Sequence, residues 1–403
     1  MKWILGVIGL ALLAPGAALA QCSFQNEVPV TSLSAGFEAW KVVTDKMAEC
    51  GNFKPELDQE FREKQAAAMA ANPSQYTIGG VANATLIPLL NDGLVRPLNS
   101  LVDEYGQDLA PNQLIDIDGD VMAIAMMINA QHLMYRSDIF EDLGLEVPTT
   151  YDEVLTAAQA IQEAGVVDYP LGGTFAPGFN LGEEFINMYL GFGGEFFNDD
   201  NTPAINNEQG IAALEMLKSL TEYMNPEYLA ADSTVVQQQF QQGEIAMANL
   251  WASRAGALDN PEESQVVGKI EFAAAPAAVA GGPPATTLWW DGFTIAQNVS
   301  DEAADAAFRL AMEGISYENL SAHPDVAIWL SNQPIESRIA AGALASAEAG
   351  APSYPASNAI SLMHTAAGDN IADFLTGAES AEKTLADIEG AYLTAARENG
   401  LIQ

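Results

Sequence analysis

Three tryptophans stand at the ends of apolar segments, beside polar side chains. Trp251 closes the stretch FQQGEIAMANLW, and Trp289 and Trp290 come directly before Asp291 and Gly292 in TTLWWDGFTIA. Aromatic rings pack against the apolar faces of sugars, while carboxylates and amides bind hydroxyl groups. Adjacent side chains of a strand point to opposite faces, so only one of the paired tryptophans can face a given side. These residues are candidates for a carbohydrate platform, with core packing as the alternative.

Motifs typical of catalysis are missing from the chain. It contains no GxSxG, HExxH, Walker A or GxGxxG sequence. The three histidines are scattered and form no metal-ligand pattern. The alternating Asp116, Asp118 and Asp120 resemble half of a calcium loop, but no closing glutamate has the required spacing, so we expect a polar turn. We therefore predict no catalytic residue, no metal site and no cofactor.

The charge balance excludes several kinds of partner. The 403 residues include 54 Asp and Glu but only 15 Lys and Arg, for a net charge of −39. Binding to nucleic acids or to anionic lipid surfaces needs clustered basic residues, which this chain lacks. The shortage of bases also disfavours strongly anionic ligands. Arg254, three residues after Trp251, is the one base that we identify as able to serve a carboxylate or a sulfonate.

The N-terminal segment reads as a targeting sequence. Lys2 precedes a short apolar stretch, and Ala18-Leu19-Ala20 has the small-x-small pattern of a cleavage site. No later stretch reaches the roughly 18 apolar residues that a spanning helix needs. We predict a signal peptide over residues 1–20 and a soluble mature protein in the periplasm. Because that compartment is oxidising, the only two cysteines, Cys22 and Cys50, are expected to form a disulfide.

Strands and helices alternate through the first hundred residues, which predicts an α/β fold with a parallel sheet covered by helices. The expected strands and the helices that follow them are 28–34 with 37–50, 53–61 with 62–71, and 76–81 with 84–90. Thr150 and Glu153 form a predicted capping box for a helix ending at Ala164. Further helices are expected over 181–192, 208–224, 234–242, 301–316 and 381–399. An Ala/Gly/Pro-rich stretch, 273–285, is expected to connect two units.

Five segments, in this order, resemble one family of proteins: MYRSDIFEDLGL (134–145), PTTYDE (148–153), GGEFF (193–197) with NNE (206–208), FQQGEIAM (240–247) and GFTI (292–295). They resemble the periplasmic solute-binding proteins of ABC-type sugar importers, the maltose-binding-protein-like group of extracellular solute-binding family 1. The chain differs from the family at Arg136, where an asparagine is usual. It also has Ser32 to Gly36 where the first strand often ends in an aromatic residue.

The resemblance implies a two-lobed, hinged fold of type II, each lobe a mostly parallel sheet flanked by helices, with the ligand between the lobes. The implied domains are an N-terminal lobe over 21–130 plus 291–332 and a C-terminal lobe over 131–290 plus 333–403. The chain would cross between the lobes near 131–133, 289–294 and 330–334. It would act as a monomer that delivers a small carbohydrate to the permease subunits of an ABC transporter, without enzymatic activity.

The resemblance also implies a set of ligand-binding residues. Trp251 and the segment from Trp289 to Gly292, which includes Trp290 and Asp291, would line the cleft. Asn129 and Gln131 precede the first crossing, where family members often present polar side chains. Further candidates follow the first three strands, where open α/β sheets bind ligands: Ser34, Glu60 and Asn83.

Two other functions stay open from the sequence. Tryptophans with an acidic side chain could form a cage for a quaternary ammonium or another small osmolyte. A secreted carbohydrate-active hydrolase or lyase would share the aromatic residues, but it would need two carboxyl groups facing each other across the cleft.

Overall fold

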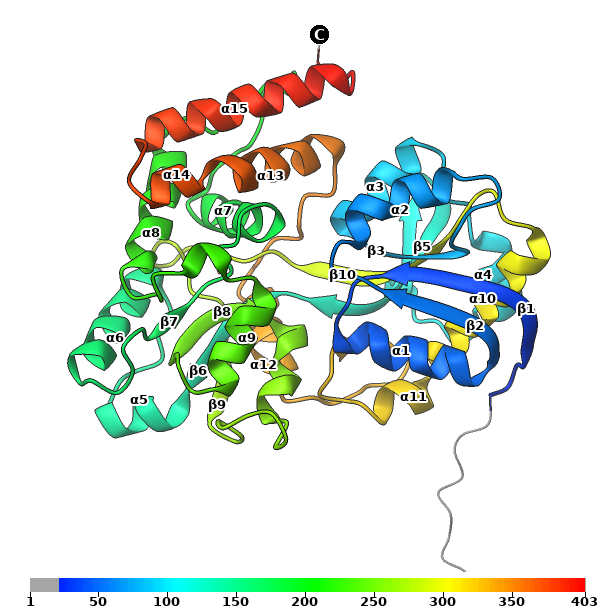
Figure 1. Ribbon diagram of the computed structural model, residues 1–403, viewed down its shortest axis with the longest axis horizontal. Helices are drawn as coiled ribbons and strands as arrows, with labels where there is room; N and C mark the ends of the chain where they lie inside the picture. Colours follow the sequence, from blue (N-terminus) through cyan, green and yellow to red (C-terminus); the bar gives the residue numbers. More distant parts are fainter. Residues whose placement is uncertain (1–21, 403) are drawn as a thin grey trace, which may run out of the picture.

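The computed structural model describes residues 22–402, which form two α/β lobes lying side by side (Figure 1). The predicted signal peptide, residues 1–20, lies outside the described residues. No helix within 22–402 is long and apolar enough to cross a membrane.

The N-terminal lobe is built on a seven-stranded sheet of order β11-β5-β10-β3-β1-β2, with β4 paired to β5. Its strands are β1 (Asn26–Ser34), β2 (Gly51–Leu57), β3 (Ile78–Ala82), β4 (Leu114–Ile117), β5 (Asp120–Asn129), β10 (Trp289–Ile295) and β11 (Ile328–Trp329). Its helices are α1 (Glu38–Glu49), α2 (Phe61–Ala70), α3 (Asn83–Asn91), α4 (Asn99–Tyr105), α10 (Asp301–Gly314) and α11 (Tyr317–Ser321).

The C-terminal lobe has a four-stranded sheet of order β7-β8-β6-β9. Its strands are β6 (Gln131–Arg136), β7 (Leu171–Gly172), β8 (Met247–Trp251) and β9 (Ile270–Ala273). Its helices are α5 (Ser137–Leu143), α6 (Tyr151–Glu163), α7 (Phe179–Gly191), α8 (Glu208–Thr221), α9 (Ser233–Gln241), the 3-10 segment η3 (Ala252–Asp259), α12 (Ala340–Glu348), α13 (Asn358–Asn370), α14 (Ala372–Leu375) and α15 (Ala381–Glu398). The predicted capping box is present, since the Glu153 amide donates to Thr150 Oγ1 and the Thr150 amide donates to Glu153 Oε2.

Within residues 22–402, the prediction of mostly parallel sheets holds for only three strand pairs, β1 with β2 and with β3 in the N-terminal lobe and β7 with β8 in the C-terminal lobe. β1 pairs in parallel with β2 and β3, as the alternating pattern predicts. β10 runs antiparallel to both β3 and β5, and in the other sheet β6 runs antiparallel to β8 and β9. The reason is that β10 enters the first sheet from the other lobe, so no helical crossover precedes it to impose a parallel direction.

Three segments join the lobes. Ala130 links β5 to β6, residues 274–288 link β9 to β10, and residues 330–339 link β11 to α12. The Ala/Gly/Pro-rich stretch thus lies in a connection, as its composition predicts. At the junction of the lobes, the end of β5 lies beside the start of β10, where Asn129 pairs with Trp289, and the end of β8 lies beside the start of β6, where Trp251 pairs with Gln131.

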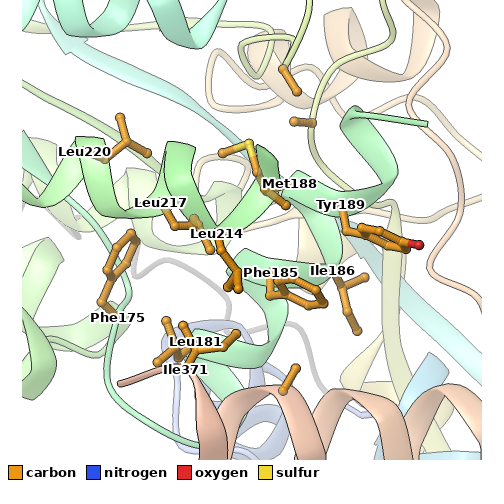
Figure 2. Close-up of a cluster of buried hydrophobic side chains, with 14 of the residues drawn as sticks. Phe175, Leu181, Phe185, Ile186, Met188, Tyr189, Leu214, Leu217, Leu220 and Ile371 are labelled. Atoms are coloured by element: carbon orange, nitrogen blue, oxygen red, sulfur yellow. The ribbon is translucent and has the colours of Figure 1, made fainter. Parts of the chain in front are cut away.

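The core of the C-terminal lobe centres on helix α7, whose buried side chains pack against α8 and Ile371 (Figure 2). Phe185 and Tyr189 stack with ring centroids 5.6 Å apart. α7 is buried on nearly every side, and it also carries two buried glutamates, Glu183 and Glu184.

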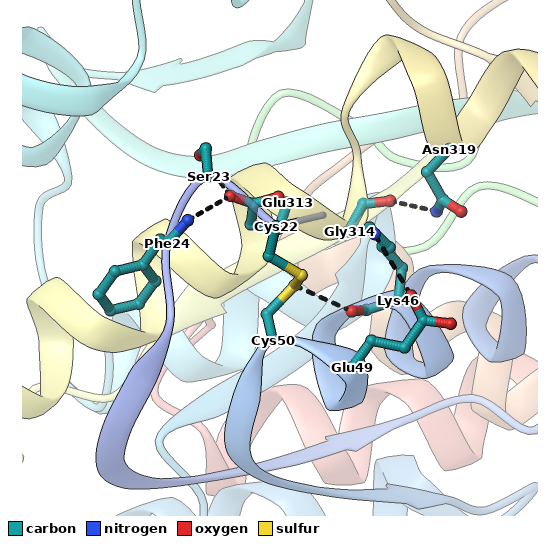
Figure 3. The surroundings of a disulfide bond; sticks show 9 residues. All are labelled: Cys22, Ser23, Phe24, Lys46, Glu49, Cys50, Glu313, Gly314 and Asn319. Atoms are coloured by element: carbon teal, nitrogen blue, oxygen red, sulfur yellow. Dashed lines mark hydrogen bonds and ion pairs between the residues drawn. A yellow bond between two sulfur atoms is a disulfide. The ribbon is translucent and has the colours of Figure 1, made fainter. Parts of the chain in front are cut away.

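The predicted disulfide between Cys22 and Cys50 is present and ties the start of the described chain to the end of α1 (Figure 3). Beside it, the Phe24 amide donates a hydrogen bond of 2.9 Å to Glu313 Oε1 on α10, and Ser23 Oγ donates to the same oxygen. The disulfide and these bonds fix the N-terminal strand to two helices of its lobe.

Candidate functional site

A cavity of about 210 Å³, which we name the central cavity, lies between the lobes. From the N-terminal lobe it is lined by Ala35, Phe37, Gln59, Phe61, Arg62, Ala82, Asn129, Trp289 and Asp291. From the C-terminal lobe it is lined by Phe179, Asn180, Asp232, Ser233, Trp251, Ser253 and Arg254. Many of the first group follow β1, β2 and β3, because the carboxyl ends of these parallel strands meet at one edge of the sheet.

The central cavity continues at both ends. At one end it shares Phe37, Gln59, Ser253 and Arg254 with a larger hollow of about 910 Å³, the mouth cavity. At the other end it shares Arg62 and Phe179 with a hollow of about 180 Å³, the inner cavity. Side chains of both lobes therefore face one continuous cleft.

Trp251 and Trp289 meet edge to face beside the central cavity, with ring centroids 5.8 Å apart. The ring of Trp289 also lies 4.0 Å from that of Tyr354 and 5.8 Å from that of Phe179. Both tryptophans are largely buried, with 9% and 4% of their surface exposed. The pair forms an aromatic wall rather than a ring of separate side chains around an open centre.

Trp290 points the other way, as the alternation of a strand requires. It is half-buried against the group of Met69, Val81, Leu86 and Leu89 in the N-terminal lobe, and it does not line the central cavity. Of the adjacent tryptophans, the structure thus brings Trp289 and not Trp290 to the cleft.

Glu183 holds the indole of Trp289. Trp289 Nε1 donates to Glu183 Oε1 at 2.9 Å and to Thr287 Oγ1 at 3.0 Å. Burial raises the pKa of Glu183 to about 8, and its other oxygen has no hydrogen-bond partner. That oxygen lies 3.9 Å from Nδ1 of His364, whose pKa burial lowers to about 4. Because His364 Nε2 faces the Phe179 carbonyl at 2.8 Å, that nitrogen carries the proton and Nδ1 accepts from Tyr354.

Polar groups from both lobes meet across the cleft at Asn129. Its Nδ2 donates to Ser253 Oγ at 3.1 Å, and the Ser253 amide donates to its Oδ1 at 3.3 Å. Asp291, also on the cavity wall, has its pKa raised to about 7 by burial, against the opposing effect of the nearby Arg62. Asp232 caps α9 by accepting from the amides of Thr234 and Val235.

Two arginines face the central cavity. The guanidinium of Arg62 lies 4.0 Å from the ring centre of Phe179 and 4.8 Å from that of Phe61. Arg62 is open to water through the cleft although protein surrounds it, and burial lowers its pKa. Arg254 donates to Ser233 Oγ at 3.2 Å and to Gln237 Oε1 at 3.5 Å. Burial lowers the pKa of Arg254 as well.

The structure brings five of the predicted ligand residues to the central cavity: Asn129, Trp251, Arg254, Trp289 and Asp291. Gln131 is fully buried and instead donates to Glu184 Oε1 at 3.0 Å. Asn83 Oδ1 accepts from the Trp290 amide at 2.8 Å, which fixes the start of β10. Glu60 is exposed at the start of α2, outside the cavity wall.

Ser34 and Gly292 also lie off the wall of the central cavity. Ser34 is fully buried at the end of β1. Gly292 lies at a register shift between β10 and β5, where a Cβ atom would come 2.1 Å from the Ile124 carbonyl oxygen. Its role is to let the two backbones approach, which holds the neighbouring Asp291 and Trp289 in place.

Sequence reasoning missed Phe37, Gln59, Phe61 and Arg62 in one lobe and Phe179, Asn180, Asp232, Ser233 and Ser253 in the other. A signal existed for the first group, because these residues follow the predicted strands by one to a few positions. The sequence offered no such signal for Phe179. This residue begins α7, and the packing of α7 in the C-terminal lobe determines that its first residue reaches the cleft.

Two α/β lobes joined by three crossings, with a solute-sized cavity between them, define a two-lobed solute-binding protein of the periplasmic type. The chain belongs to the family of bacterial extracellular solute-binding proteins, which its residues 40–312 match.

Curated relatives agree with this family. A protein of Deinococcus radiodurans, named a probable ABC transporter-binding protein, is 30% identical over 315 residues, which cover 72% of each chain. A protein of Sinorhizobium fredii, named a probable amino-acid ABC transporter periplasmic-binding protein, is 22% identical over 67% of this chain. That match spans 63% of the length of the Sinorhizobium protein.

Solved structures share the fold. A solute-binding protein of Agrobacterium radiobacter K84, in complex with ribitol, has a TM-score of 0.81 at 20% identity, covering 92% of this chain and 100% of that one. A solute-binding protein of Agrobacterium vitis S4, with bound D-mannitol, has a TM-score of 0.78 at 20% identity, covering 92% and 99%.

Proposed function

We propose that the protein is a periplasmic receptor that binds a carbohydrate or a sugar derivative and delivers it to an ABC import permease. The observation that carries this function is the central cavity, where Trp251 and Trp289 offer an aromatic wall and Asn129, Ser253 and Asp291 offer polar groups. Such a combination suits a solute with apolar ring faces and hydroxyl edges. Structural neighbours bound to ribitol and D-mannitol support it.

The lobes proposed to close on the solute are 21–130 plus 291–332 and 131–290 plus 333–403. The protein acts as a monomer, is exported through its signal peptide, and performs no catalytic step. Family membership supports a binding role.

A quaternary ammonium ligand is less well matched. A cage for such a cation needs aromatic faces turned toward an empty centre. Here Trp251 and Trp289 contact each other, and Arg62 already lies over the face of Phe179. The two guanidinium groups beside the cavity would also repel a cationic ligand.

A thermal-shift screen tests the proposal. The purified mature protein is heated with monosaccharides, disaccharides, polyols, sugar acids, amino acids and betaines. A sugar or sugar derivative is expected to raise the melting temperature, and calorimetry then measures its dissociation constant. A shift by betaines or amino acids alone, or by no solute at all, would contradict a carbohydrate receptor.

A further inference from the structure

The arginines of this protein fall into two groups. With 54 acidic residues in the chain, an arginine should find a carboxylate easily. Ion pairs within 4.0 Å do engage four of the seven: Arg96, Arg136, Arg309 and Arg338. Within residues 22–402, the three with no carboxylate oxygen at that distance are Arg62, Arg254 and Arg397.

Two of these three face the central cavity, one from each lobe and one at each end. Arg62, on α2, lies where the central cavity meets the inner cavity. Arg254, in η3, lies where the central cavity meets the mouth cavity. Arg397 is instead exposed in the last turn of α15, where a helix terminus and solvent stabilise a cation.

Arg254 is half-buried, and a guanidinium that has lost part of its water is unfavourable unless an anion or several acceptors replace that water. Its hydrogen bonds go to one hydroxyl and one amide oxygen. Arg62 is open to the cleft and lies over the faces of two aromatic rings. Asp291 attracts Arg62 and Asp232 attracts Arg254, but neither aspartate lies within 4.0 Å of the guanidinium nitrogens, so neither forms a direct ion pair.

Resting on the function proposed above, we infer that the solute carries a carboxylate, which one of these two guanidinium groups binds at its end of the central cavity while the hydroxyl-bearing part of the solute lies against Trp251 and Trp289. The ligand class is a sugar acid, such as a uronate or an aldonate. A carboxylate accepts two parallel hydrogen bonds from a guanidinium, a geometry that a neutral hydroxyl does not reproduce.

The test compares matched pairs of solutes by titration calorimetry on the mature protein. The probes are D-glucuronate against D-glucose, D-galacturonate against D-galactose, and D-gluconate against D-glucitol, with L-glutamate and acetate as acids without a sugar. An acid is expected to bind at least about 10-fold more tightly than its neutral partner, the size of a charged hydrogen bond.

Single variants then assign the groups. One of Arg62→Gln and Arg254→Gln should weaken binding of the acid about 10- to 100-fold while changing the affinity for the neutral partner far less. Arg397→Gln is the matched control, because it removes the same charge from an unpaired arginine outside the cleft and should leave both affinities unchanged. Circular dichroism and melting temperature confirm that each variant folds. A loss of affinity for the acid in either variant alone is enough to place the carboxylate at that arginine.

The outcomes separate this inference from the proposed function. Tight binding of a neutral sugar or polyol, with no preference for the acid, overturns the inference and leaves the carbohydrate receptor standing. Binding of L-glutamate or acetate without any sugar acid supports recognition of a carboxylate and overturns the carbohydrate receptor. Binding of none of these probes overturns both.

Discussion

At the scale of single residues, the orientation of Trp289 matters most for the proposed ligand. Its indole N–H is held by Glu183 and Thr287 behind the cavity, and its ring is packed between Tyr354 and Trp251. A ring held in this way loses little freedom when a solute binds, so the part of the ring that faces the cavity contributes to affinity with little ordering cost.

Replacing the tryptophans one at a time distinguishes a tryptophan that contacts the solute from one that only packs in the core. Trp251→Ala and Trp289→Phe are expected to weaken solute binding at least about 10-fold, because each removes contact area at the cavity and the second also loses the bond to Glu183. Trp290→Ala should reduce stability by about 1 to 3 kcal/mol, because this half-buried ring packs against the core, and it should leave affinity unchanged. Calorimetry and urea unfolding measure the two effects, and a large affinity loss in Trp290→Ala would place that residue back at the ligand.

The buried carboxyl of Glu183 predicts a dependence of stability on pH. Its pKa is about 8 in the folded protein, above the value of an exposed glutamate, so the folded state holds the proton more tightly than the unfolded chain. The stability that this group contributes is complete below about pH 4.5 and is lost as pH rises toward 8. Relative to Glu183→Gln, the wild type should therefore lose a few kcal/mol between pH 5 and pH 8 in urea unfolding. Parallel curves for the two proteins would refute this assignment.

The sequence was informative about residues only as far as local rules reach. Strand alternation correctly required Trp289 and Trp290 to face opposite sides, but which side is the cleft depends on where β10 lies in the sheet. Gln131 and Asn83 were expected at the ligand as polar residues near crossings, and the structure instead uses them for buried hydrogen bonds. Arg62 follows Glu60 by two positions, so the rule that places ligand residues after strand ends selected a close neighbour that does not line the cavity.

At the scale of elements, the alternation of strands and helices in the first lobe was predictable because hydrophobic spacing and turn residues are local. The position at which β2 ends was not predictable from local spacing. The expected strand over 53–61 stops at Leu57, because Asp58 accepts a hydrogen bond from the Glu60 amide and turns the chain into α2. That turn carries Phe61 and Arg62 into the cleft, so a boundary error of a few residues hid two site residues.

The disulfide belongs to this scale as well, since it joins the N-terminal segment to the end of α1 across a sequence separation of 28. The double variant Cys22→Ser, Cys50→Ser is expected to lose about 3 to 4 kcal/mol of unfolding free energy, because the unfolded chain regains the freedom that the loop removes. Solute affinity should not change, as neither cysteine lines the cleft. Urea unfolding of both proteins checks the loss, and equal midpoints would show that the Glu313 contacts alone hold the segment.

At the scale of the whole molecule, charge acts differently at the surface and in the cleft. The net charge of −39 suggested that anionic ligands would be disfavoured. Surface charges are screened over a Debye length of about 8 Å at physiological ionic strength, whereas two unpaired guanidinium groups at the cavity act on a ligand directly. Composition describes the field around the protein, and it does not determine the preference of a site built from a few selected residues.

Closure of the two lobes is the remaining prediction. Because the cavity walls come from both lobes, a solute that contacts Trp251 and Asp291 together favours the state in which the lobes are close. Fluorophores on Lys41→Cys and Glu263→Cys, which face each other across the mouth cavity, should show higher energy transfer when solute is added. At 100 times its dissociation constant, the same solute should raise the free energy of unfolding by about 2.7 kcal/mol. As a control, a pair of fluorophores within the C-terminal lobe, on Glu263→Cys and Glu398→Cys, should show no change in energy transfer when solute is added. If calorimetry detects binding while the inter-lobe transfer stays constant, the solute binds to lobes that do not move, and closure is not part of the mechanism.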